Sequence, residues 1–250
     1  MSDIVAEPSG NILSIQLNRP AKKNAMTSSM YITMAELLNA AAKNDQIRVV
    51  LWHGAGNSFS AGNDIEDFMK NPPGPGESPQ TQLIHALINF EKPLVAAVQG
   101  AAIGGGTTML AHCDFVYAGE SAKFQLPFVN LALVPEFGSS YLLPLRFGYT
   151  RAAELILLGK PFDASRAAEL GLVTQVVPDQ SLLATATETA RTLAAKPAAA
   201  VQGSKRLMKC ASREQLEQAV KLENEVFAER VRSDDAKQAF QAFFARRQPA

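Results

Sequence analysis

Short apolar runs alternate with segments of helical periodicity over about three quarters of this chain, and that alternation most constrains its fold. Leu13, Ile15 and Leu17 alternate with polar residues, which predicts a half-buried strand. The segment 27–44 then carries apolar residues at helical spacing behind a Thr/Ser start. Further strands are predicted at 47–54, 93–100, 114–119 and 171–177. This order favours an α/β core.

A helical tail follows the alternating part. From about residue 181 the pattern is almost wholly helical, and residues 212–247 mix many charges with recurring Leu, Val, Ala and Phe. We therefore divide the chain into a core at 1–195 and a helical region at 196–250. The tail ends in three phenylalanines, Phe240, Phe243 and Phe244. So much aromatic surface predicts that the last helix docks on its own core or on a neighbouring subunit.

Composition excludes several classes of protein. With 24 basic and 24 acidic residues the formal charge is zero, which argues against a nucleic-acid binder that relies on bulk electrostatics. The two cysteines are too few for a disulfide scaffold and fit a reducing compartment. We expect no signal peptide, because "MSDIVAEPSG" lacks a basic region followed by an apolar run, and we expect no membrane span, because no apolar stretch approaches the length that crosses a bilayer. We expect a cytoplasmic protein without membrane or nucleic-acid partners.

Two glycine turns, each after a predicted strand, are candidates for binding an oxygen atom. "AAIGGGTT" (101–108) leaves bare backbone N–H groups at a helix start, a place that suits an anion or an oxygen on which negative charge develops. "AGND" (61–64) offers a second turn with free amides. The plain alternatives are close strand–helix packing for the first and a tight turn capped by Asp64 for the second. Sequence spacing leaves open whether the two turns meet.

The candidate acid is Glu136, which lies in the otherwise apolar stretch "LALVPEFGSS" (131–140). One interpretation is an acid in the first turn of a helix, with Pro135 at the first helical position. The other is a proton-transfer group. Other catalytic patterns are weak: the three histidines lack metal-ligand spacing, so we expect no metal, and no G-x-S-x-G elbow is present.

Five segments in this order resemble the crotonase, or enoyl-CoA hydratase/isomerase, superfamily. They are "LNRPAKKNAM", "FSAGNDIEDF", "KPLVAAVQGAAIGGG", "CDFVYAGESAKF" and "LGKPFDASRAAELGLVTQVVP". The resemblance implies a spiral of ββα units and a C-terminal helical region for trimerisation, with trimers often paired into hexamers. It also implies acyl-CoA thioester substrates, so that coenzyme A is part of the substrate and no separate cofactor is expected.

The resemblance also implies site residues. The thioester oxygen is expected between the backbone amides of Asn63 and Gly105, the two positions that match the family's oxyanion hole. Coenzyme A is expected near a group of residues from both ends of the chain: Lys22, Lys23, Ala61, Phe243 and Arg246.

Departures from the family pattern narrow the reaction. Hydratases of this family carry two glutamates, at positions that are Thr108 and Phe128 here. Neither side chain can usefully exchange a proton with water, so a two-glutamate hydratase mechanism is disfavoured. "VPEFGSS" instead resembles the Δ3,Δ2-enoyl-CoA isomerases, which place a single acid there. Glu136 would move a proton from C2 to C4 through a dienolate. Its apolar neighbours raise its pKa and a helix start lowers it, so the net shift stays open.

Rival functions remain. One is 2-enoyl-CoA hydration with water positioned by Glu136 alone, and another is isomerisation of ring-containing or epoxide thioesters. A rival of a different class is a non-catalytic member that binds acyl-CoA or RNA.

Overall fold

The computed structural model describes residues 2–72 and 76–245. Its main element is a six-stranded sheet in the order β1-β2-β3-β4-β6-β9. Only β1 is antiparallel to its neighbour, and every other pairing in this sheet is parallel. The strands are β1 Ile4–Ser9, β2 Ile12–Leu17, β3 Val49–Gly54, β4 Leu94–Val98, β6 Phe115–Gly119 and β9 Gln175–Val177. A second sheet, in the order β5-β7-β8, contains Ala101–Ile103, Lys123–Gln125 and Phe162–Asp163.

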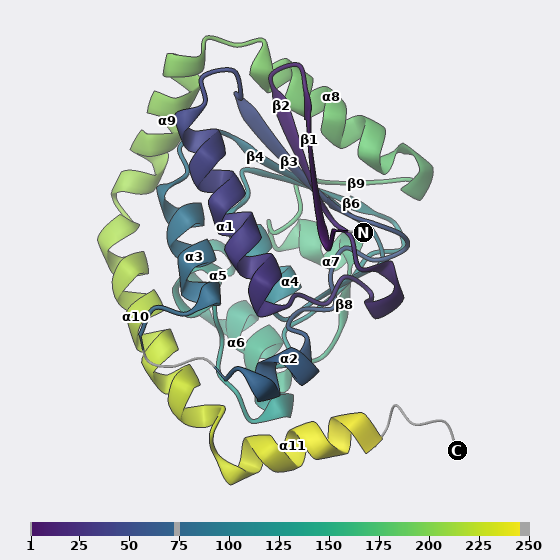
Figure 1. The fold of residues 1–250 in the computed structure, drawn as a ribbon, viewed down its shortest axis with the longest axis vertical. Helices are drawn as coiled ribbons and strands as arrows, with labels where there is room; N and C mark the ends of the chain where they lie inside the picture. The colour runs from purple at the N-terminus through teal and green to yellow at the C-terminus, as the bar shows by residue number, and fades with distance from the viewer. Residues whose placement is uncertain (1, 73–75, 246–250) are drawn as a thin grey trace.

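Helices cover both faces of the large sheet (Figure 1). The α-helices are α1 Ser28–Lys43, α2 Ile65–Lys70, α3 Pro79–Asn89, α4 Gly105–Thr108, α5 Ser139–Phe147, α6 Tyr149–Leu158, α7 Ala164–Glu169, α8 Leu182–Ala194, α9 Ala198–Cys210, α10 Arg213–Arg230 and α11 Asp234–Ala245. Short 3-10 helices lie at Pro20–Lys22, Met109–His112, Val129–Leu131 and Asp179–Ser181.

The alternation of side chains along each strand produces two apolar layers. Leu51 on β3 faces α8 and belongs to a small cluster with Leu182 and Ala186. Its neighbours on the strand, Val50 and Trp52, point the other way into the large core shared with α1 and α3. Successive side chains of a strand point to opposite faces, so a strand buried on both faces appears as a continuous apolar run. This explains the pattern at 47–54.

The predicted strands are confirmed, with one correction in length. Each of the five predicted segments contains a strand, but β9 begins only at Gln175, within the predicted 171–177. Leu172 and Val173 are instead buried in the core, where their amides both donate to the carbonyl oxygen of Ala167 as α7 ends. Apolar residues that close a helix thus resemble the start of a strand.

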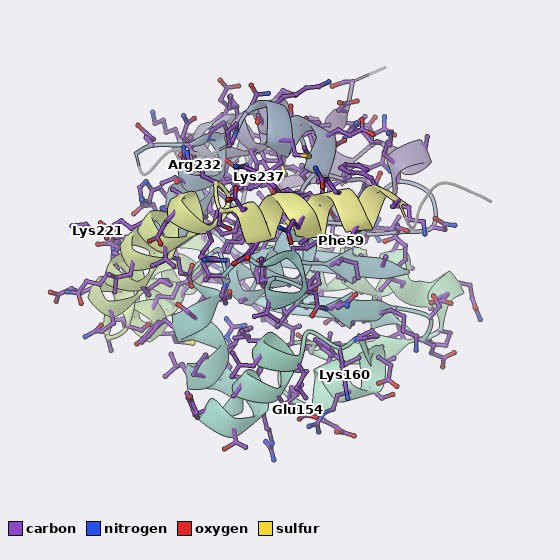
Figure 2. All side chains as sticks on the ribbon, turned by 90° about the horizontal axis from the view of Figure 1, so that it is seen from below. Phe59, Glu154, Lys160, Lys221, Arg232 and Lys237 are labelled. Atoms are coloured by element: carbon purple, nitrogen blue, oxygen red, sulfur yellow. The ribbon has the colours of Figure 1, made fainter. Side chains whose placement is uncertain are left out.

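The tail runs along one side of the core and then crosses beneath it (Figure 1). Seen from below, α11 lies across the middle of the molecule (Figure 2). Phe240 of α11 and Phe227 of α10 are buried, and both rings meet Phe68 of α2 edge to face at centroid distances of 6.4 and 5.6 Å. The prediction that the last helix docks on its own core is therefore confirmed, whereas the division at residue 195 and the oligomeric role of the tail stay predictions.

The described ranges 2–72 and 76–245 lack two further features. No helix in them has the length and apolar character that crossing a membrane requires. The same ranges contain no group of three or more His, Cys, Asp or Glu residues that could hold a metal ion.

Candidate active site

The two glycine turns lie directly against each other. Gly62 has a φ of +83°, and a Cβ there would stand 2.5 Å from the carbonyl oxygen of Ile103 and 3.6 Å from the amide nitrogen of Gly105. Ser60, just before the first turn, pairs with Ala102 on the strand that leads into the second. The two turns therefore meet, which the sequence spacing had left open. Close packing explains why Gly62 cannot carry a side chain.

Each turn leaves one backbone N–H group available, that of Asn63 in the first turn and that of Gly105 in the second. Gly105 is the first residue of α4, and the first N–H groups of a helix have no acceptor within it. Asn63 forms an isolated bridge with Met26. The two hydrogen bonds of this bridge join Met26 N to Gly62 O and Asp64 N to Met26 O, so neither uses the Asn63 amide. Asn63 and Gly105 therefore bring two backbone amides to the lining of one cavity.

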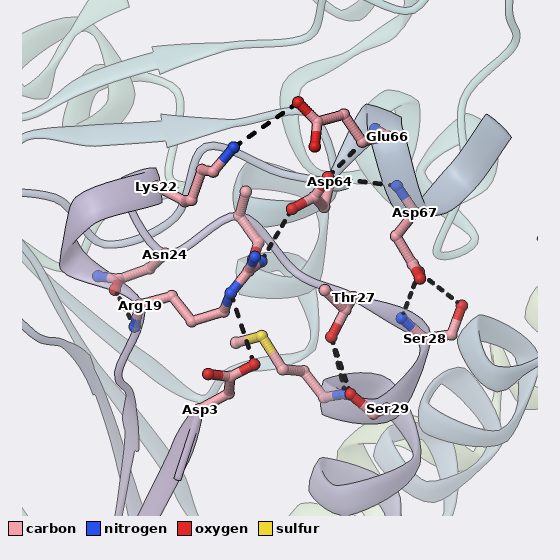
Figure 3. Close-up of polar contacts among 12 residues, drawn as sticks. Asp3, Arg19, Lys22, Asn24, Thr27, Ser28, Ser29, Asp64, Glu66 and Asp67 are labelled. Carbon is pink, nitrogen blue, oxygen red and sulfur yellow. Dashed lines mark hydrogen bonds and ion pairs between the residues drawn. The ribbon is translucent and has the colours of Figure 1, made fainter. Parts of the chain in front are cut away.

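Asp64 fills the structural role expected of it. Its Oδ1 accepts from the amides of Glu66 and Asp67 at 3.1 and 3.3 Å, which caps α2, and its Oδ2 lies 3.0 Å from Arg19 Nη1 (Figure 3). These amides and the Arg19 guanidinium hold the pKa of Asp64 below its usual value, although burial opposes them as the largest single influence. Asp64 is therefore ionised, and both of its carboxylate oxygens already have partners.

Glu136 lies at the junction of the two turns, and it is not in a helix. α5 begins at Ser139 with Gly138 as its N-cap, so the alternative of a first-turn acid with Pro135 at the first helical position is wrong. The carboxylate is 5% exposed, and a Cβ on Gly105 would stand 2.8 Å from its Oε1. The Asn63 side-chain amide donates to its two oxygens at 3.2 and 3.4 Å.

Burial decides the protonation of Glu136. Loss of hydration raises its pKa to about 7, the Asn63 hydrogen bond acts in the opposite direction, and the charge of Glu223 raises the pKa further. The direction that the sequence left open is therefore upward. A carboxyl group with a pKa near neutrality can both take up and release a proton at physiological pH.

Tyr31 is a site residue that sequence reasoning missed. Its hydroxyl donates to Asn63 Oδ1 at 2.6 Å, and this fixes the Asn63 amide with its nitrogen toward Glu136. Burial, and next the charge of Glu136, raise the pKa of Tyr31 well above its usual value, so the hydroxyl stays a donor. At helical spacing inside α1 the residue resembles any core aromatic residue, and only its polar end distinguishes it.

The cavity that holds Glu136 has a volume of about 270 Å³. Three carboxylates line its described part, Asp64, Glu66 and Glu136. Asp64 is paired with Arg19, and Glu66 stands more than half exposed at 3.7 Å from Lys22 (Figure 3). Among these three, Glu136 alone is buried without a cation.

The two positions that carry glutamates in family hydratases offer no second acid. Thr108 is fully buried and does not line the cavity; its hydroxyl donates to the carbonyl oxygen of Gly104 at 3.3 Å, within its own helix. Phe128 lines the cavity with an apolar ring.

Four of the five residues expected near coenzyme A line this cavity too. They are Lys22, Lys23, Ala61 and Phe243. Arg246, the fifth, lies outside the described residues. The structure thus brings segments from both ends of the chain to one opening.

We expect Glu136 to lose its proton as the pH rises through about 7. Asn63→Ala removes a hydrogen bond that favours the carboxylate form, so the pKa of Glu136 should be higher in this variant than in the wild type. The measurement follows the carboxyl carbon of Glu136 by NMR in a pH titration. A pKa that falls or stays unchanged in Asn63→Ala would contradict the assigned contact.

Comparisons with known proteins agree with this geometry. The family model described as enoyl-CoA hydratase/isomerase matches residues 7–250. The chain is 35% identical over 256 residues to 1,2-epoxyphenylacetyl-CoA isomerase of Escherichia coli K12, covering all of this chain and 98% of that protein. It is 35% identical to enoyl-CoA delta isomerase 2 of Homo sapiens, covering 98% of this chain and 64% of the relative. It is also 35% identical to enoyl-CoA hydratase EchA19 of Mycobacterium tuberculosis, covering 99% and 95%.

A solved structure shows the same fold. The enoyl-CoA hydratase/isomerase of Pseudoalteromonas atlantica T6c superposes with a TM-score of 0.93 at 39% identity, covering 100% of this chain and 99% of that one. The predicted crotonase-like α/β fold is confirmed. The chain belongs to the enoyl-CoA hydratase/isomerase family, the crotonase superfamily, and is an enzyme of that family.

Proposed function

We propose that this enzyme is a Δ3,Δ2-enoyl-CoA isomerase, which moves a double bond from C3 to C2 of an acyl-CoA thioester. The observation that carries the proposal is Glu136, which alone among the carboxylates lining the described cavity is buried without a cation and which lies beside Asn63 and Gly105. Thr108 and Phe128 supply no second acid for the addition of water. The relationship to a human enoyl-CoA delta isomerase supports the same activity.

The proposed reaction needs one acid–base group. The carboxylate of Glu136 takes a proton from C2, and the electron pair of that C–H bond delocalises through the thioester carbonyl onto its oxygen. The amides of Asn63 and Gly105 stabilise this dienolate. Glu136 then gives the proton to C4, where the C3–C4 π electrons form the new C–H bond. At the same time the electrons on the enolate oxygen re-form the carbonyl, and a C2–C3 double bond results.

The two amides would supply much of the rate. Loss of one oxyanion donor typically costs about 3–4 kcal/mol of transition-state stabilisation. Backbone donors at the start of α4 and in the AGND turn are held by the isolated bridges of Asn63 with Met26 and of Ser60 with Ala102, so they need no reorganisation as the charge develops.

The coenzyme A part of the substrate would bind at the mouth of the cavity. Lys22 and Lys23 suit its phosphates, while Ala61 and Phe243 border the same opening. We keep Arg246 as a proposed contact. Coenzyme A enters as part of the substrate, and we propose no separate cofactor.

A second candidate acts on ring-containing acyl groups. Six phenylalanines line the cavity: Phe68, Phe128, Phe227, Phe240, Phe243 and Phe244. One relative is named for the isomerisation of an epoxyphenylacetyl thioester. Aromatic walls favour offset or edge-to-face contacts with a ring.

The test supplies a 3-enoyl-CoA and, separately, a 2-enoyl-CoA, and follows the absorbance of the conjugated thioester. An isomerase raises the absorbance with the first substrate and lowers it little with the second. Rapid loss of absorbance with the 2-enoyl-CoA would establish hydration instead, and no change with either would direct the search to ring-containing thioesters.

Oligomeric state and location stay proposals. We propose a homotrimer or a pair of trimers, because large apolar side chains are exposed on helices of the described chain, including Tyr149 on α6 at 77% and Leu207 and Met208 on α9 at 73 and 75%. We also keep the cytoplasmic location as a prediction.

A further inference from the structure

The backbone directly after Glu136 has an unfavourable conformation. Phe137 has a φ of +63° and Gly138 one of +67°, and the amide of Ser139 donates to the carbonyl oxygen of Glu136 at 3.2 Å. A tight turn with two positive φ angles suits glycine and is disfavoured for phenylalanine. Such backbone persists only where the surroundings over-determine it. Something must therefore hold this turn.

Two buried side chains hold it. His112 Nε2 donates to the carbonyl oxygen of Phe137 at 2.7 Å; burial lowers the pKa of His112 to about 3, so the ring is neutral. From α10, Glu223 accepts the amide of Gly138 on Oε2 at 2.6 Å and the amide of Ser140 on Oε1 at 2.7 Å. The three bonds fix the turn and the start of α5.

The hydrogen bonds to Glu223 favour its carboxylate form. Both of its oxygens accept backbone N–H groups, which leaves no acceptor to which a protonated form could donate on that side. The positive end of α5 favours its charge, although burial, at 6% exposure, works against it and raises its pKa to about 7. α10 packs closely here, since a Cβ on Gly138 would stand 2.4 Å from Leu216 Cδ1.

We propose that Glu223 is a positioning residue for the isomerisation: it clamps the turn that follows Glu136, so that the seating of α10 sets where the acid–base carboxyl group stands. The inference rests on the proposed function of Glu136. α10 also carries Phe227, a wall of the cavity, so one helix fixes both the base and part of the acyl site. The tail is thereby a part of the catalytic apparatus rather than an appendage.

The test compares Glu223→Gln with Glu225→Gln, an exposed acid on the same helix. A Gln keeps the shape of Glu223 but can accept only one of the two amides, because its NH2 group is a donor. We expect kcat with a 3-enoyl-CoA to fall about 10- to 100-fold in Glu223→Gln, the usual scale for the loss of a supporting hydrogen bond or a small displacement of a reacting group. The inhibition constant of a saturated acyl-CoA should be the same in Glu223→Gln as in the wild type. Glu225→Gln should match the wild type in both measurements.

Two further readouts separate positioning from general damage. Removal of the Glu223 charge should move the acidic limb of the pH–rate profile to lower pH, because that charge raises the pKa of Glu136. The polar and titratable side chains that interact with Glu136 are Asn63, Tyr31 and Glu223. Hydrogen exchange of the amides at 136–142 should accelerate in Glu223→Gln. Glu223→Asp, which keeps the charge with a shorter reach, should give an intermediate kcat.

The proposal is overturned if Glu223→Gln keeps the wild-type kcat and the wild-type exchange at 136–142. If Glu223→Gln does not fold, Glu223→Asp decides by the same readouts. The exchange measurement needs no substrate, so a wild type without isomerase activity would contradict the proposed function and leave the clamp to be judged by exchange alone.

Discussion

Glu136→Gln is expected to lower kcat with a 3-enoyl-CoA by about 10³-fold or more, near the upper end of what a positioned acid–base group contributes. The amide keeps the size of the side chain but cannot take a proton from C2. No other carboxylate lining the described cavity can replace it, because Asp64 is held by Arg19 and the cap of α2, and Glu66 stands at the exposed rim. The measurement is the initial rate at saturating substrate, with the exposed Glu225→Gln as control.

The same variant should be more stable than the wild type above neutral pH. The folded protein raises the pKa of Glu136 from 4.5 to about 7, so between these values it binds more protons than the unfolded chain, and the free energy of unfolding falls as the pH rises. Gln does not ionise, so its melting temperature should exceed that of the wild type at pH 8. An inactive variant that is also less stable would point to misfolding, and wild-type activity would remove Glu136 from the mechanism.

Gly105→Ala is expected to lower kcat/KM by about 10²–10³-fold, the scale of losing one oxyanion donor. The new Cβ would stand 2.8 Å from Glu136 Oε1, 3.2 Å from Tyr31 Oη and 3.4 Å from Met26 Cε. The first distance is shorter than real contacts allow, so the carboxyl group must move away from the amide. The φ of Gly105 is not positive, and the loss therefore comes from crowding rather than from backbone strain.

The control for Gly105→Ala is Gly203→Ala in α9. A Cβ at Gly203 meets nothing within 4 Å, and Ala is favoured over Gly inside a helix by about 1 kcal/mol. We expect Gly203→Ala to keep the activity and to raise the stability slightly. If Gly105→Ala retained wild-type kcat/KM, the carboxyl group of Glu136 could not act from its position against Gly105.

The sequence alone draws attention to the parts of the site that lie in turns marked by glycine or proline. The two glycine turns stand out because each follows a predicted strand, and Glu136 stands out as a charge in an apolar stretch, whereas the roles of Asn63 and Gly105 come only from the resemblance to the family. Their meeting could not be predicted, because it depends on the pairing of Ser60 with Ala102. The upward pKa shift likewise depends on burial that spacing does not reveal.

Tyr31 and Glu223 lie on long helices, where the apolar periodicity does not distinguish a site residue from a core residue. Tyr31 continues the apolar stripe of α1. Glu223 occupies the buried stripe of α10 that also contains Leu216, Val220 and Phe227, a place where an apolar residue is expected. A charge inside such a stripe is the sequence signal that could have identified Glu223, but the many charges of the tail obscure it. The strands β5, β7 and β8 are not predicted, because two or three residues give no periodicity. β1 is not predicted either, since only Ile4 among its six residues is buried.

The most direct test of the central claim follows one proton. A 3-enoyl-CoA carrying deuterium on C2 is converted in ordinary water, and the earliest product is analysed by NMR. If Glu136 carries the proton, the product is the 2-enoyl-CoA, with deuterium transferred to C4 above the level that solvent exchange gives. A 3-hydroxyacyl-CoA as the first product, or a 2-enoyl-CoA with only solvent hydrogen added at C4, would contradict the single-carboxylate isomerase.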